Sequence, residues 1–375
     1  MMSTNQGVWL HAIQTAVPPT SYPQELALDF MKGLPLYGDK ERAFLDRIYQ
    51  GTMIDRRHSV IEDYGKPVDQ YQFFVAHESL LPEPTVSARN DLFVTWANRL
   101  SAEAVSGLLT ALPELDRSTI THLITVSCTG FSAPGFDYHL VTTLGLSDRI
   151  HRYHIGFMGC YAGFPAMKLA HTICSADPSA RVLIADVELC TLHFQFKPEQ
   201  DTMVANALFA DGAAAALVSA EPPVTGRTAL RLDRFFSRIL AESDSAMTWR
   251  LGDIAFDMRL SAYVPRLIKR DIAAIVRDTM AEEPTTGDAT GDTAWWAIHP
   301  GGRAILDRVA TALDLQPNAL EDSFAVLRDY GNMSSATIFF VLKRMLERQA
   351  EGSVFAVAFG PGLTIESARM TLARG

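Results

Sequence analysis

A cysteine at position 160 is the first residue of this chain whose surroundings suggest chemistry. It lies between small residues in the run GFMGCYAGFPAMKLA (residues 156–170), directly before a segment with helical spacing. Unpaired N–H groups and the macrodipole at a helix N-terminus favour an anion. Such a position, or a nearby imidazolium, lowers the pKa of a cysteine. Cys160 is therefore a candidate nucleophile, although free cysteines are also common as inert packing residues.

Two polar residues in the second half of the chain have side chains that suit such a nucleophile. His299 follows the strand-like run WWAI and precedes Pro-Gly-Gly, and Asn332 lies in the run GNMSS. Cysteine needs a base or an imidazolium partner to attack, and imidazole and amide N–H groups can donate hydrogen bonds to a developing oxyanion. A lone histidine is more often a core residue, and an asparagine after glycine is more often a turn or cap. The prediction of a site depends on all three residues together.

Composition narrows the class of protein. The 375 residues are 48% hydrophobic, which suits one large globular domain or two medium ones. The formal charge of −10 argues against broad electrostatic binding of nucleic acid or of an anionic membrane. No stretch reads as a signal peptide or a transmembrane helix.

The cysteines favour neither a metal site nor a disulfide framework. Cys128, Cys160, Cys174 and Cys190 show no C-x-x-C spacing and no zinc-like arrangement with histidine. A chain of this size with so few cysteines is typical of a reducing compartment, so we expect no metal and a cytoplasmic protein.

Strand-like and helical segments alternate along most of the chain, which favours an α/β fold with helices packed on a sheet. The predicted strands cover residues 7–18, 121–127, 181–185, 229–240, 295–298, 353–359 and 363–373. The predicted helices cover residues 23–50, 87–112, 130–144, 160–175, 263–280, a segment from 303, and 333–349. Residues 206–219 are predicted as a glycine-broken helix followed by a strand, and residues 282–292 as a surface loop.

The two halves of the chain follow a similar order. In each, a strand runs into a glycine-rich turn that carries a reactive residue and then into a helix. We therefore predict an internal duplication that joins near residues 221–226, with one half at 1–223 carrying the cysteine and one at 224–375 carrying the histidine and asparagine. Alternation of this kind is also found in α/β chains without duplication.

Several motifs, taken in order from residue 7 to residue 373, resemble the type III polyketide synthases, the chalcone and stilbene synthase family. They are MGCYAG (158–163), ALFADGAA (207–214), HPGG (299–302), GNMSS (331–335) and FGPGLT (359–364). The resemblance implies a thiolase fold, a duplicated five-layered αβαβα architecture, in a homodimer.

The resemblance also implies a reaction. Cys160 would take an acyl group from a starter acyl-CoA as a thioester. His299 and Asn332 would hold the malonyl-CoA carbonyl during decarboxylation and condensation, and His299 would keep Cys160 ionised. Phe209 would separate the CoA tunnel from the cavity. No metal or other cofactor is implied beyond the substrates acyl-CoA and malonyl-CoA, and the poly-β-keto chain would cyclise to a pyrone, a resorcinol or a related polyphenol.

Other positions imply a pocket and a CoA site that depart from the plant enzymes. The implied pocket residues are Phe209, Cys128, Cys190, Trp249, Met258, Ser334 and Pro361, and the implied CoA-binding residues are Arg47, Arg56, Gly301, Gly302 and Arg303, with Arg57, Lys269 and Arg270 as further basic candidates. Of the basic positions that plant members use for CoA phosphates, only Arg47 remains. The bulky Trp249 and the Met258 that replaces a plant Phe indicate a microbial-type enzyme, for which we favour a fatty-acyl starter, with a small acyl starter as the alternative.

Two other functions compete with this one. A ketoacyl synthase of the fatty-acid initiation type shares Cys, His and Asn but would take malonyl groups from a carrier protein. A thiolase-fold binding subunit without catalysis would bind acyl-CoA and leave Cys160 unacylated. The HPGG and FGPG runs favour the polyketide synthase over the first, and the presence of all three polar residues disfavours the second.

Overall fold

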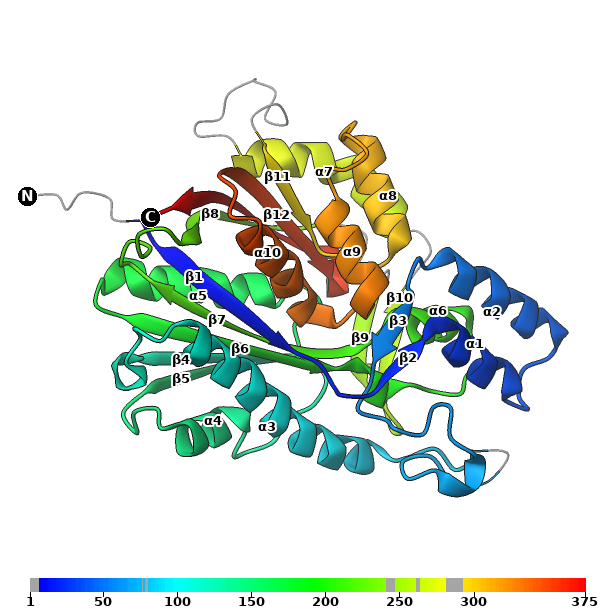
Figure 1. The fold of residues 1–375 in the computed structure, drawn as a ribbon. Helices are drawn as coiled ribbons and strands as arrows, with labels where there is room; N and C mark the ends of the chain where they lie inside the picture. Colours follow the sequence, from blue (N-terminus) through cyan, green and yellow to red (C-terminus); the bar gives the residue numbers. More distant parts are fainter. Residues whose placement is uncertain (1–6, 76, 78–79, 241–246, 261–263, 281–292) are drawn as a thin grey trace, which may run out of the picture.

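A mixed sheet runs through the computed structural model, which describes residues 7–75, 77, 80–240, 247–260, 264–280 and 293–375. Within these residues, nine strands pair in the order β11-β12-β13-β8-β1-β7-β6-β4-β5 (Figure 1). Two short antiparallel pairs, β2 with β3 and β9 with β10, lie outside this sheet.

The bounds of the elements follow the chain. The strands are β1 (Trp9–Ala16), β2 (Ser21–Pro23), β3 (Arg56–His58), β4 (His122–Ser127), β5 (His151–Gly156), β6 (Arg181–Leu189), β7 (Asp211–Ser219), β8 (Thr228–Ile239), β9 (Met247–Leu251), β10 (Phe256–Leu260), β11 (Trp295–Ile298), β12 (Gly352–Gly360) and β13 (Thr364–Arg374). The α-helices are α1 (Gln24–Gly33), α2 (Asp39–Gly51), α3 (Val86–Ala111), α4 (Phe136–Leu144), α5 (Gly163–Ala176), α6 (Gln200–Leu208), α7 (Val264–Met280), α8 (Arg303–Ala312), α9 (Glu321–Tyr330) and α10 (Thr337–Glu347). Short 3₁₀ turns are η1 (Val68–Gln70), η2 (Arg117–Thr119), η3 (Cys190–His193), η4 (Ser334–Ala336) and η5 (Pro361–Leu363).

Alternation along the strands divides the core into layers, because successive side chains of a strand point to opposite faces. In β6, Val182 and Ile184 join a central cluster with α5 and α10, whereas Leu183 and Ala185 pack with α3 and α4. In β12, Ala356 and its neighbours of the same parity join the same central cluster, and the alternate residues pack with α7, α8 and α9. The result is five layers: helices, sheet, the central pair α5 and α10, sheet, and helices.

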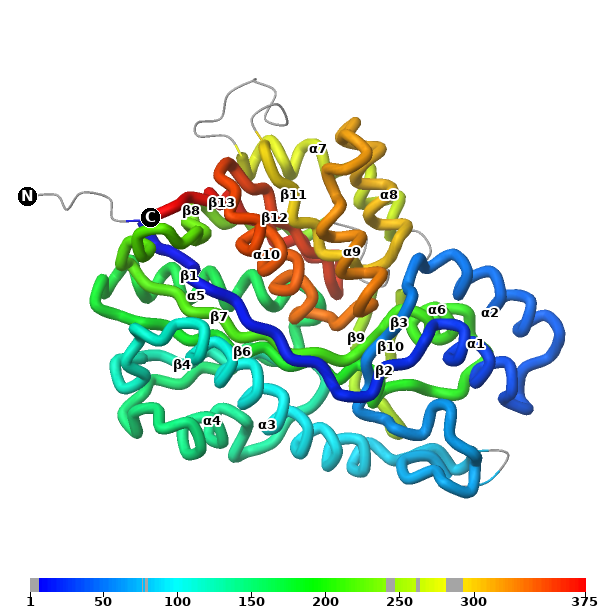
Figure 2. Tube along the Cα trace, viewed as in Figure 1, coloured from blue at the N-terminus to red at the C-terminus, as the bar shows by residue number. Residues whose placement is uncertain are grey.

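The pairing of the strands repeats in the two halves. β6 pairs in parallel with β4 and antiparallel with β7, which pairs antiparallel with β1. β12 likewise pairs in parallel with β11 and antiparallel with β13, which pairs antiparallel with β8. α5 precedes β6 as α10 precedes β12. The two sets meet where β1 pairs with β8 over only Trp9 with Arg231 and Leu10 with Leu230 (Figure 2).

Several sequence predictions need correction. The helical region at 23–50 is two helices, α1 and α2, with Pro35 between them. The predicted helix within 206–219 begins earlier, as α6, and Asp211 already starts β7. The alanine run of β7 has a high helix propensity, but burial between β1 and β6 makes it a strand. β2, β3, β5, β9, β10 and α9 were not predicted, and the loop at 282–292 lies outside the described residues.

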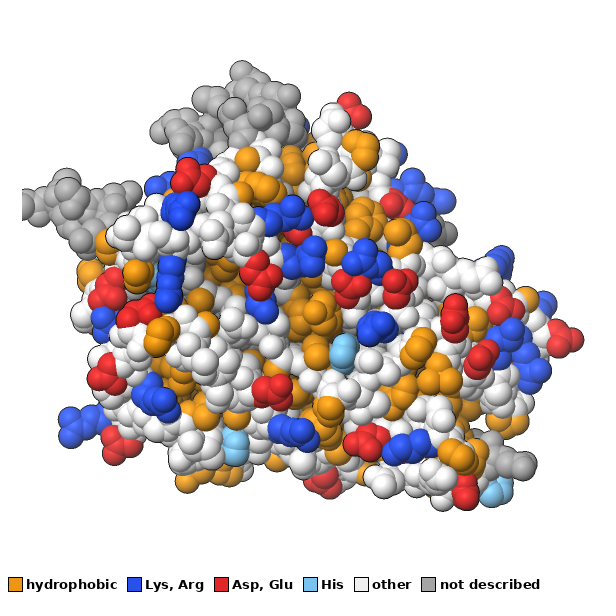
Figure 3. Space-filling view, viewed as in Figure 1, with side chains coloured by type: hydrophobic (Ala, Val, Ile, Leu, Met, Phe, Trp, Pro, Cys, Tyr) orange, Lys and Arg blue, Asp and Glu red, His pale blue; other side chains and the backbone are white. Residues whose placement is uncertain are grey.

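Charge and hydropathy of the described residues agree with a globular chain. Over the face drawn in Figure 3, Lys and Arg side chains alternate with Asp and Glu. No helix in the described ranges combines the length and the apolar character needed to cross a bilayer.

Candidate active site

Cys160 lies in the turn that leads into α5, with only 7% of its surface exposed. The turn is closed by the Ala162 N–H, which donates to the Gly159 carbonyl at 2.9 Å. Gly159 has a φ of +86°, and a Cβ at this position would lie 2.3 Å from Cδ of Pro361. Only glycine combines this backbone conformation with so close an approach, so the turn fixes the direction of the cysteine.

The backbone of Asn332 pairs with that of residues 208–210, which we call the Phe209 segment. Its N–H donates to the Leu208 carbonyl and its carbonyl accepts from the Ala210 N–H, both at 2.9 Å. Its side-chain Oδ1 accepts from the Ser334 N–H at 2.9 Å, and its Nδ2 donates to the Gly301 carbonyl at 3.3 Å. These bonds leave the amide little freedom to rotate.

His299 is the first residue after β11, and its N–H donates to the Val357 carbonyl at 2.8 Å. The side chain is buried, and neither ring nitrogen has a hydrogen-bond partner among the residues that the structure describes. A Cβ on Gly301 would lie 3.5 Å from Nε2 of His299, so Gly301 lies against the ring. Buried polar groups normally have partners, and an unpaired imidazole here is ready to bind a group from outside the protein.

The central helices bring Cys160 and Asn332 together, and Gly301, which lies against the His299 ring, accepts a hydrogen bond from the Asn332 amide. α5 and α10 form the middle layer, and Cys160 and Asn332 precede their respective N-termini. The side chains of Ser334 and Asn332 hydrogen-bond to the thiol of Cys160. Residues far apart in sequence thus share one site.

Burial controls the charge of the two titratable site residues. Loss of solvation raises the pKa of the Cys160 thiol to about 12, against the hydrogen bonds from Ser334 and Asn332. Burial lowers the pKa of His299 to about 3. Burial therefore outweighs the lowering of the Cys160 pKa expected at a helix N-terminus, because the loss of solvation exceeds the favourable contacts. The site at rest holds a neutral thiol and a neutral imidazole.

A small cavity of about 20 Å³ adjoins Cys160. It is lined by every residue that was predicted for the pocket: Phe209, Cys128, Cys190, Trp249, Met258, Ser334 and Pro361. Thr129, Gly159 and Met247 also line it and were not predicted. The Trp249 ring is fixed, because its Nε1–H donates to the Cys128 carbonyl at 2.7 Å and the ring packs edge-on against His193 with centroids 5.3 Å apart.

Arg57 is not available to a CoA phosphate, which corrects its place among the basic candidates. It is buried, and its guanidinium donates to Oε1 of Gln24 at 2.9 Å and to the carbonyls of Asn206 and Phe209 at 2.7 and 2.8 Å. Arg57 instead fixes the backbone of the Phe209 segment. The ring of Tyr49 lies 5.9 Å from its guanidinium.

The other predicted CoA residues lie at different distances from the chemistry. Gly301 and Gly302 are buried next to His299 and to Leu208. Arg303 opens α8 and forms an ion pair with Asp307 at 3.3 Å. The remaining four, Arg47 on α2, Arg56 on β3, and Lys269 and Arg270 on α7, are exposed and do not line the cavity.

Sequence reasoning missed a pair of buried acids behind the cavity. Asp186 and Glu188 are fully buried on β6, and both contact the Ser335 hydroxyl, at 2.9 and 2.5 Å. Two carboxyl groups at i and i+2 in the otherwise apolar run VLIADVEL were the available signal, since neighbours of equal parity share a face of a strand.

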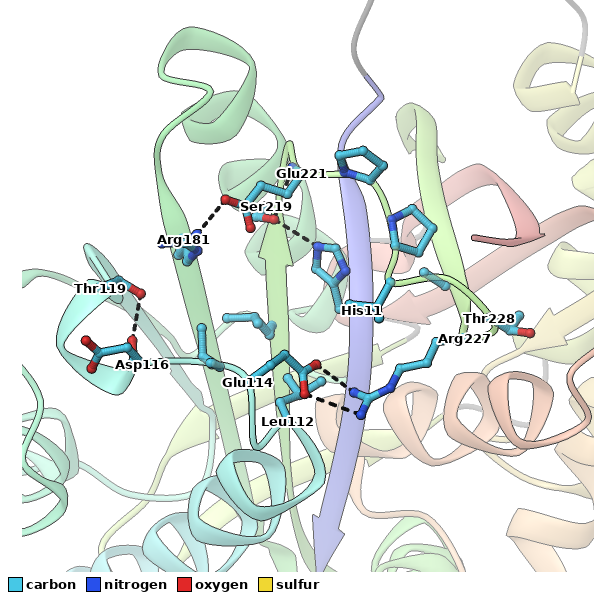
Figure 4. Close-up of a pocket in the computed structure, with 16 residues that line it drawn as sticks. His11, Leu112, Glu114, Asp116, Thr119, Arg181, Ser219, Glu221, Arg227 and Thr228 are labelled. Atoms are coloured by element: carbon cyan, nitrogen blue, oxygen red, sulfur yellow. Dashed lines mark hydrogen bonds and ion pairs between the residues drawn. The ribbon is translucent and has the colours of Figure 1, made fainter.

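A larger pocket lies elsewhere, where β1, β7 and β8 meet. Figure 4 shows His11 directed to Ser219, with 2.8 Å between His11 Nε2 and Ser219 Oγ, and Arg227 paired with Glu114 at 2.8 Å. Its volume is about 210 Å³. No cysteine lines this pocket. Nor do the described residues contain a cluster of His, Cys, Asp and Glu that could hold a metal ion.

Comparison with known proteins agrees with the fold. Residues 2–222 match the N-terminal domain of chalcone and stilbene synthases, and residues 232–372 match the C-terminal domain. A bisdemethoxycurcumin synthase of Oryza sativa subsp. japonica is 32% identical over 373 residues, covering 95% of this chain and 90% of the relative.

Two solved structures superpose over almost the whole chain. The C-terminal type III polyketide synthase domain of Steely1 from Dictyostelium has a TM-score of 0.86 at 26% identity, covering 98% of this chain and 99% of that one. PKS-I from the brown alga Ectocarpus siliculosus has a TM-score of 0.88 at 26% identity, covering 98% of each chain.

Fold and comparisons together define the class: this is an acyltransferase with the thiolase fold, built as five layers. Within that class, the chain belongs to the chalcone and stilbene synthase family and is a type III polyketide synthase. The carrier-protein-dependent ketoacyl synthase considered as an alternative finds no support in these comparisons.

Proposed function

We propose that Cys160 is the nucleophile that carries the growing chain. Attack on an acyl-CoA requires the buried thiol to lose its proton, and the neutral His299 ring in the same site is the base that can accept it. Hydrogen bonds from Ser334 and Asn332 stabilise the sulfur as it gains negative charge. His299 then returns the proton to the leaving sulfur, so that CoA leaves as a thiol and the acyl group remains on Cys160 as a thioester.

His299 and Asn332 then hold the thioester carbonyl of malonyl-CoA. Loss of CO₂ places negative charge on that carbonyl oxygen as an enolate, and N–H donors aimed at it lower the barrier; one such donor is worth about 2.7–4 kcal/mol. The enolate carbon attacks the acyl-cysteine, and the extended chain, still joined to CoA, returns to Cys160 for the next cycle. Phe209 and the other apolar walls favour the loss of the charged carboxylate.

The observation that carries this proposal is the pair of buried ring nitrogens of His299 without a partner, beside a fixed Asn332 amide. A neutral imidazole at this position supplies an N–H donor and a lone pair acceptor at once. No metal or other cofactor is required by these steps, and acyl-CoA and malonyl-CoA are the substrates.

The walls of the cavity support a starter of a few carbons rather than the fatty-acyl starter favoured from sequence. Trp249 is fixed by its hydrogen bond, and the free space beside Cys160 is about 20 Å³. A space of this size holds about one water, so any acyl group must displace flexible side chains such as Met247 and Met258, and a short acyl group displaces the least. The product that follows from a small starter is a small aromatic polyphenol or pyrone.

We also propose a homodimer of two-part chains, 1–223 and 224–375, in the cytoplasm. Apolar side chains are exposed on and around the edge strand β5, namely Phe131, Tyr138, Tyr153 and Phe157, each between 42% and 55%. A patch of this kind suits a second copy of the chain. All four cysteines are free, which suits a reducing compartment.

The test is an incubation of the purified protein with malonyl-CoA and acyl-CoAs from acetyl to long-chain. Mass spectrometry of products and of the intact protein is expected to show an acyl adduct on Cys160 and products that begin from short acyl groups. Products from long-chain starters alone would contradict the small starter. An absence of product from every CoA ester, with activity from a malonyl carrier protein, would contradict the proposed function.

A further inference from the structure

The two buried acids of β6, Asp186 and Glu188, contact the same Ser335 hydroxyl. The number of hydrogen atoms available for these two contacts determines the total charge of the pair. The Ser335 Oγ lies 2.9 Å from Oδ1 of Asp186 and 2.5 Å from Oε1 of Glu188. A hydroxyl has one hydrogen to donate. One carboxyl group must therefore be protonated and donate to Ser335, or the second contact would join two acceptors.

The surroundings show which of the two holds the proton. Oε2 of Glu188 accepts from the Cys128 N–H and from the Thr129 hydroxyl, both at 2.9 Å. Oδ2 of Asp186 is buried and accepts nothing from the described residues. Hydrogen bonds from donors favour the ionised form of a carboxyl group. Asp186 is thus the neutral acid and Glu188 the carboxylate, and the hydrogen bonds run from Asp186 to Ser335 to Glu188.

Glu188 is the member of the pair whose charge reaches the nucleophile. Its negative charge opposes ionisation of Cys160, and its Oε2 contacts the Cys128 N–H, whereas Asp186 contacts Ser335. The other groups facing the pair are the thiols of Cys128, from the end of β4, and Cys190, from the end of β6, with Asp211 of β7 beside Cys190. Glu188 also reaches the nucleophile turn by contact, because Sγ of Cys128 accepts the Gly159 N–H at 2.9 Å.

We propose that Asp186 is a positioning residue that moves negative charge away from Cys160 when the thiolate forms. The proton leaves Oδ1 of Asp186 for Ser335 Oγ, and Ser335 passes its own hydrogen to Oε1 of Glu188. The pair keeps one proton and a total charge of −1 throughout. The charge now lies on Asp186, and Glu188 is neutral. Along β6, Asp186 is two residues further than Glu188 from Cys190, which lines the cavity together with Cys160. This inference rests on the proposed role of Cys160.

The experiment measures the rate of Cys160 alkylation by iodoacetamide against pH, read from the mass of the peptide that contains Cys160. Asp186→Asn has the same shape but cannot release a proton, so Glu188 stays charged. We expect alkylation at pH 8 to fall about tenfold, a shift of the midpoint by about one pH unit to higher pH. Ser335→Ala keeps both acids and removes the hydroxyl between them, and the same shift is expected.

Two further variants separate charge from packing. Glu188→Gln removes the carboxylate and is expected to move the midpoint below that of the unchanged protein. In that background, adding Asp186→Asn is expected to have no further effect, since no charge remains to be moved. Asp211→Asn, a buried acid on the neighbouring strand, is the matched control and leaves the midpoint where it was.

Profiles of Asp186→Asn and Ser335→Ala that coincide with the unchanged protein would overturn the proposal, as would equal shifts in the presence and absence of Glu188. If Asp186→Asn does not fold, the pH profile of Cys160 alkylation in Ser335→Ala tests the proposal by itself. The readout needs no turnover, so its failure is distinct from failure of the proposed function, which shows as a missing acyl adduct.

Discussion

Strands β6 and β12 occupy the same place in the two halves of the molecule but carry opposite kinds of side chain. Asp186 of β6 pairs with Val126, the last residue but one of β4, and Ala356 of β12 pairs with Ala297, the last residue but one of β11. Two residues further along, Glu188 corresponds by register to Ala358. The first half therefore directs two acids into the central layer where the second half directs two methyl groups.

The difference follows from what lies at the end of the neighbouring strand. β4 is followed by Cys128 and Thr129, whose N–H and hydroxyl donate to Glu188. β11 is followed by His299, whose ring is buried with unpaired nitrogens. A carboxylate beside His299 would charge the ring and remove its free lone pair. We conclude that the first half of the site holds one buried negative charge, shared by Asp186 and Glu188. The second half, around His299, must remain neutral.

The largest expected effect comes from Cys160→Ser, because the hydroxyl has no ionisable form in this site. Product formation should fall by more than about a thousandfold, measured by mass spectrometry of the products. Cys174→Ser, on α5 and outside the cavity, is the control and should retain most of the activity. Unchanged turnover in Cys160→Ser would show that the first half of the chain does not supply the nucleophile.

Ala358→Glu tests whether the second half tolerates an acid. The new carboxylate would lie buried opposite Glu366, its pairing partner on β13, with none of the donors that Glu188 has. A buried charge without a partner costs about 3–5 kcal/mol of unfolding free energy, which urea titration measures. Ala358→Gln has nearly the same volume and should cost less. Equal stability of the two variants would contradict the stated difference between the halves.

Asn332→Ala removes one donor from the neutral half. Acylation of Cys160 should persist, while release of CO₂ from malonyl-CoA should fall about a hundred- to a thousandfold, followed with radiolabelled malonyl-CoA. Asn318→Ala, on the loop before α9, provides a matched amide deletion. Undiminished decarboxylation would mean that the donor is another residue.

Asp186→Asn should give the smallest effect, a change in thermal stability that depends on pH. Burial raises the pKa of Asp186 well above its usual range, so the folded protein keeps a proton that the unfolded chain has lost above about pH 4. The unfolded state then binds fewer protons, and stability falls as the pH rises through that window. Asparagine does not titrate. The melting temperature of the variant relative to the unchanged protein should increase by about 2 °C between pH 5 and pH 8, whereas Asp148→Asn on the surface should show no such trend.

Local sequence patterns were enough to predict much of the fold and the candidate residues of the site. Periodicity located most strands and helices, and the motif order indicated Cys160, His299, Asn332 and the cavity residues. Charge states could not be read in this way, because the pKa of Cys160 depends on burial by residues distant in sequence. Arg57 looked like a surface cation from its neighbours Arg56 and His58. Only the packed structure shows that its guanidinium is enclosed by carbonyls.

Short, exposed or polar elements were also beyond the reach of the sequence. β5 reads HRYHIG, with no apolar alternation, and is a strand because β4 offers it an edge. The joining of Asp186, Ser335 and Glu188 depends on contacts across 147 and 149 residues of chain. No window of sequence contains such information.

The place of β1 in the middle of the sheet has a consequence for how the protein is made. β1 is synthesised well before its partners β7 and β8, which come about 200 residues later, as the pairing of Ala16 with Ala213 shows. At about 5–20 residues per second, synthesis of that interval takes about 10–40 s. During this time the hydrogen-bonding edges of β1 are unpaired and open to wrong partners. Yield of native protein should therefore respond to translation speed and to chaperones that cover the nascent β1 segment.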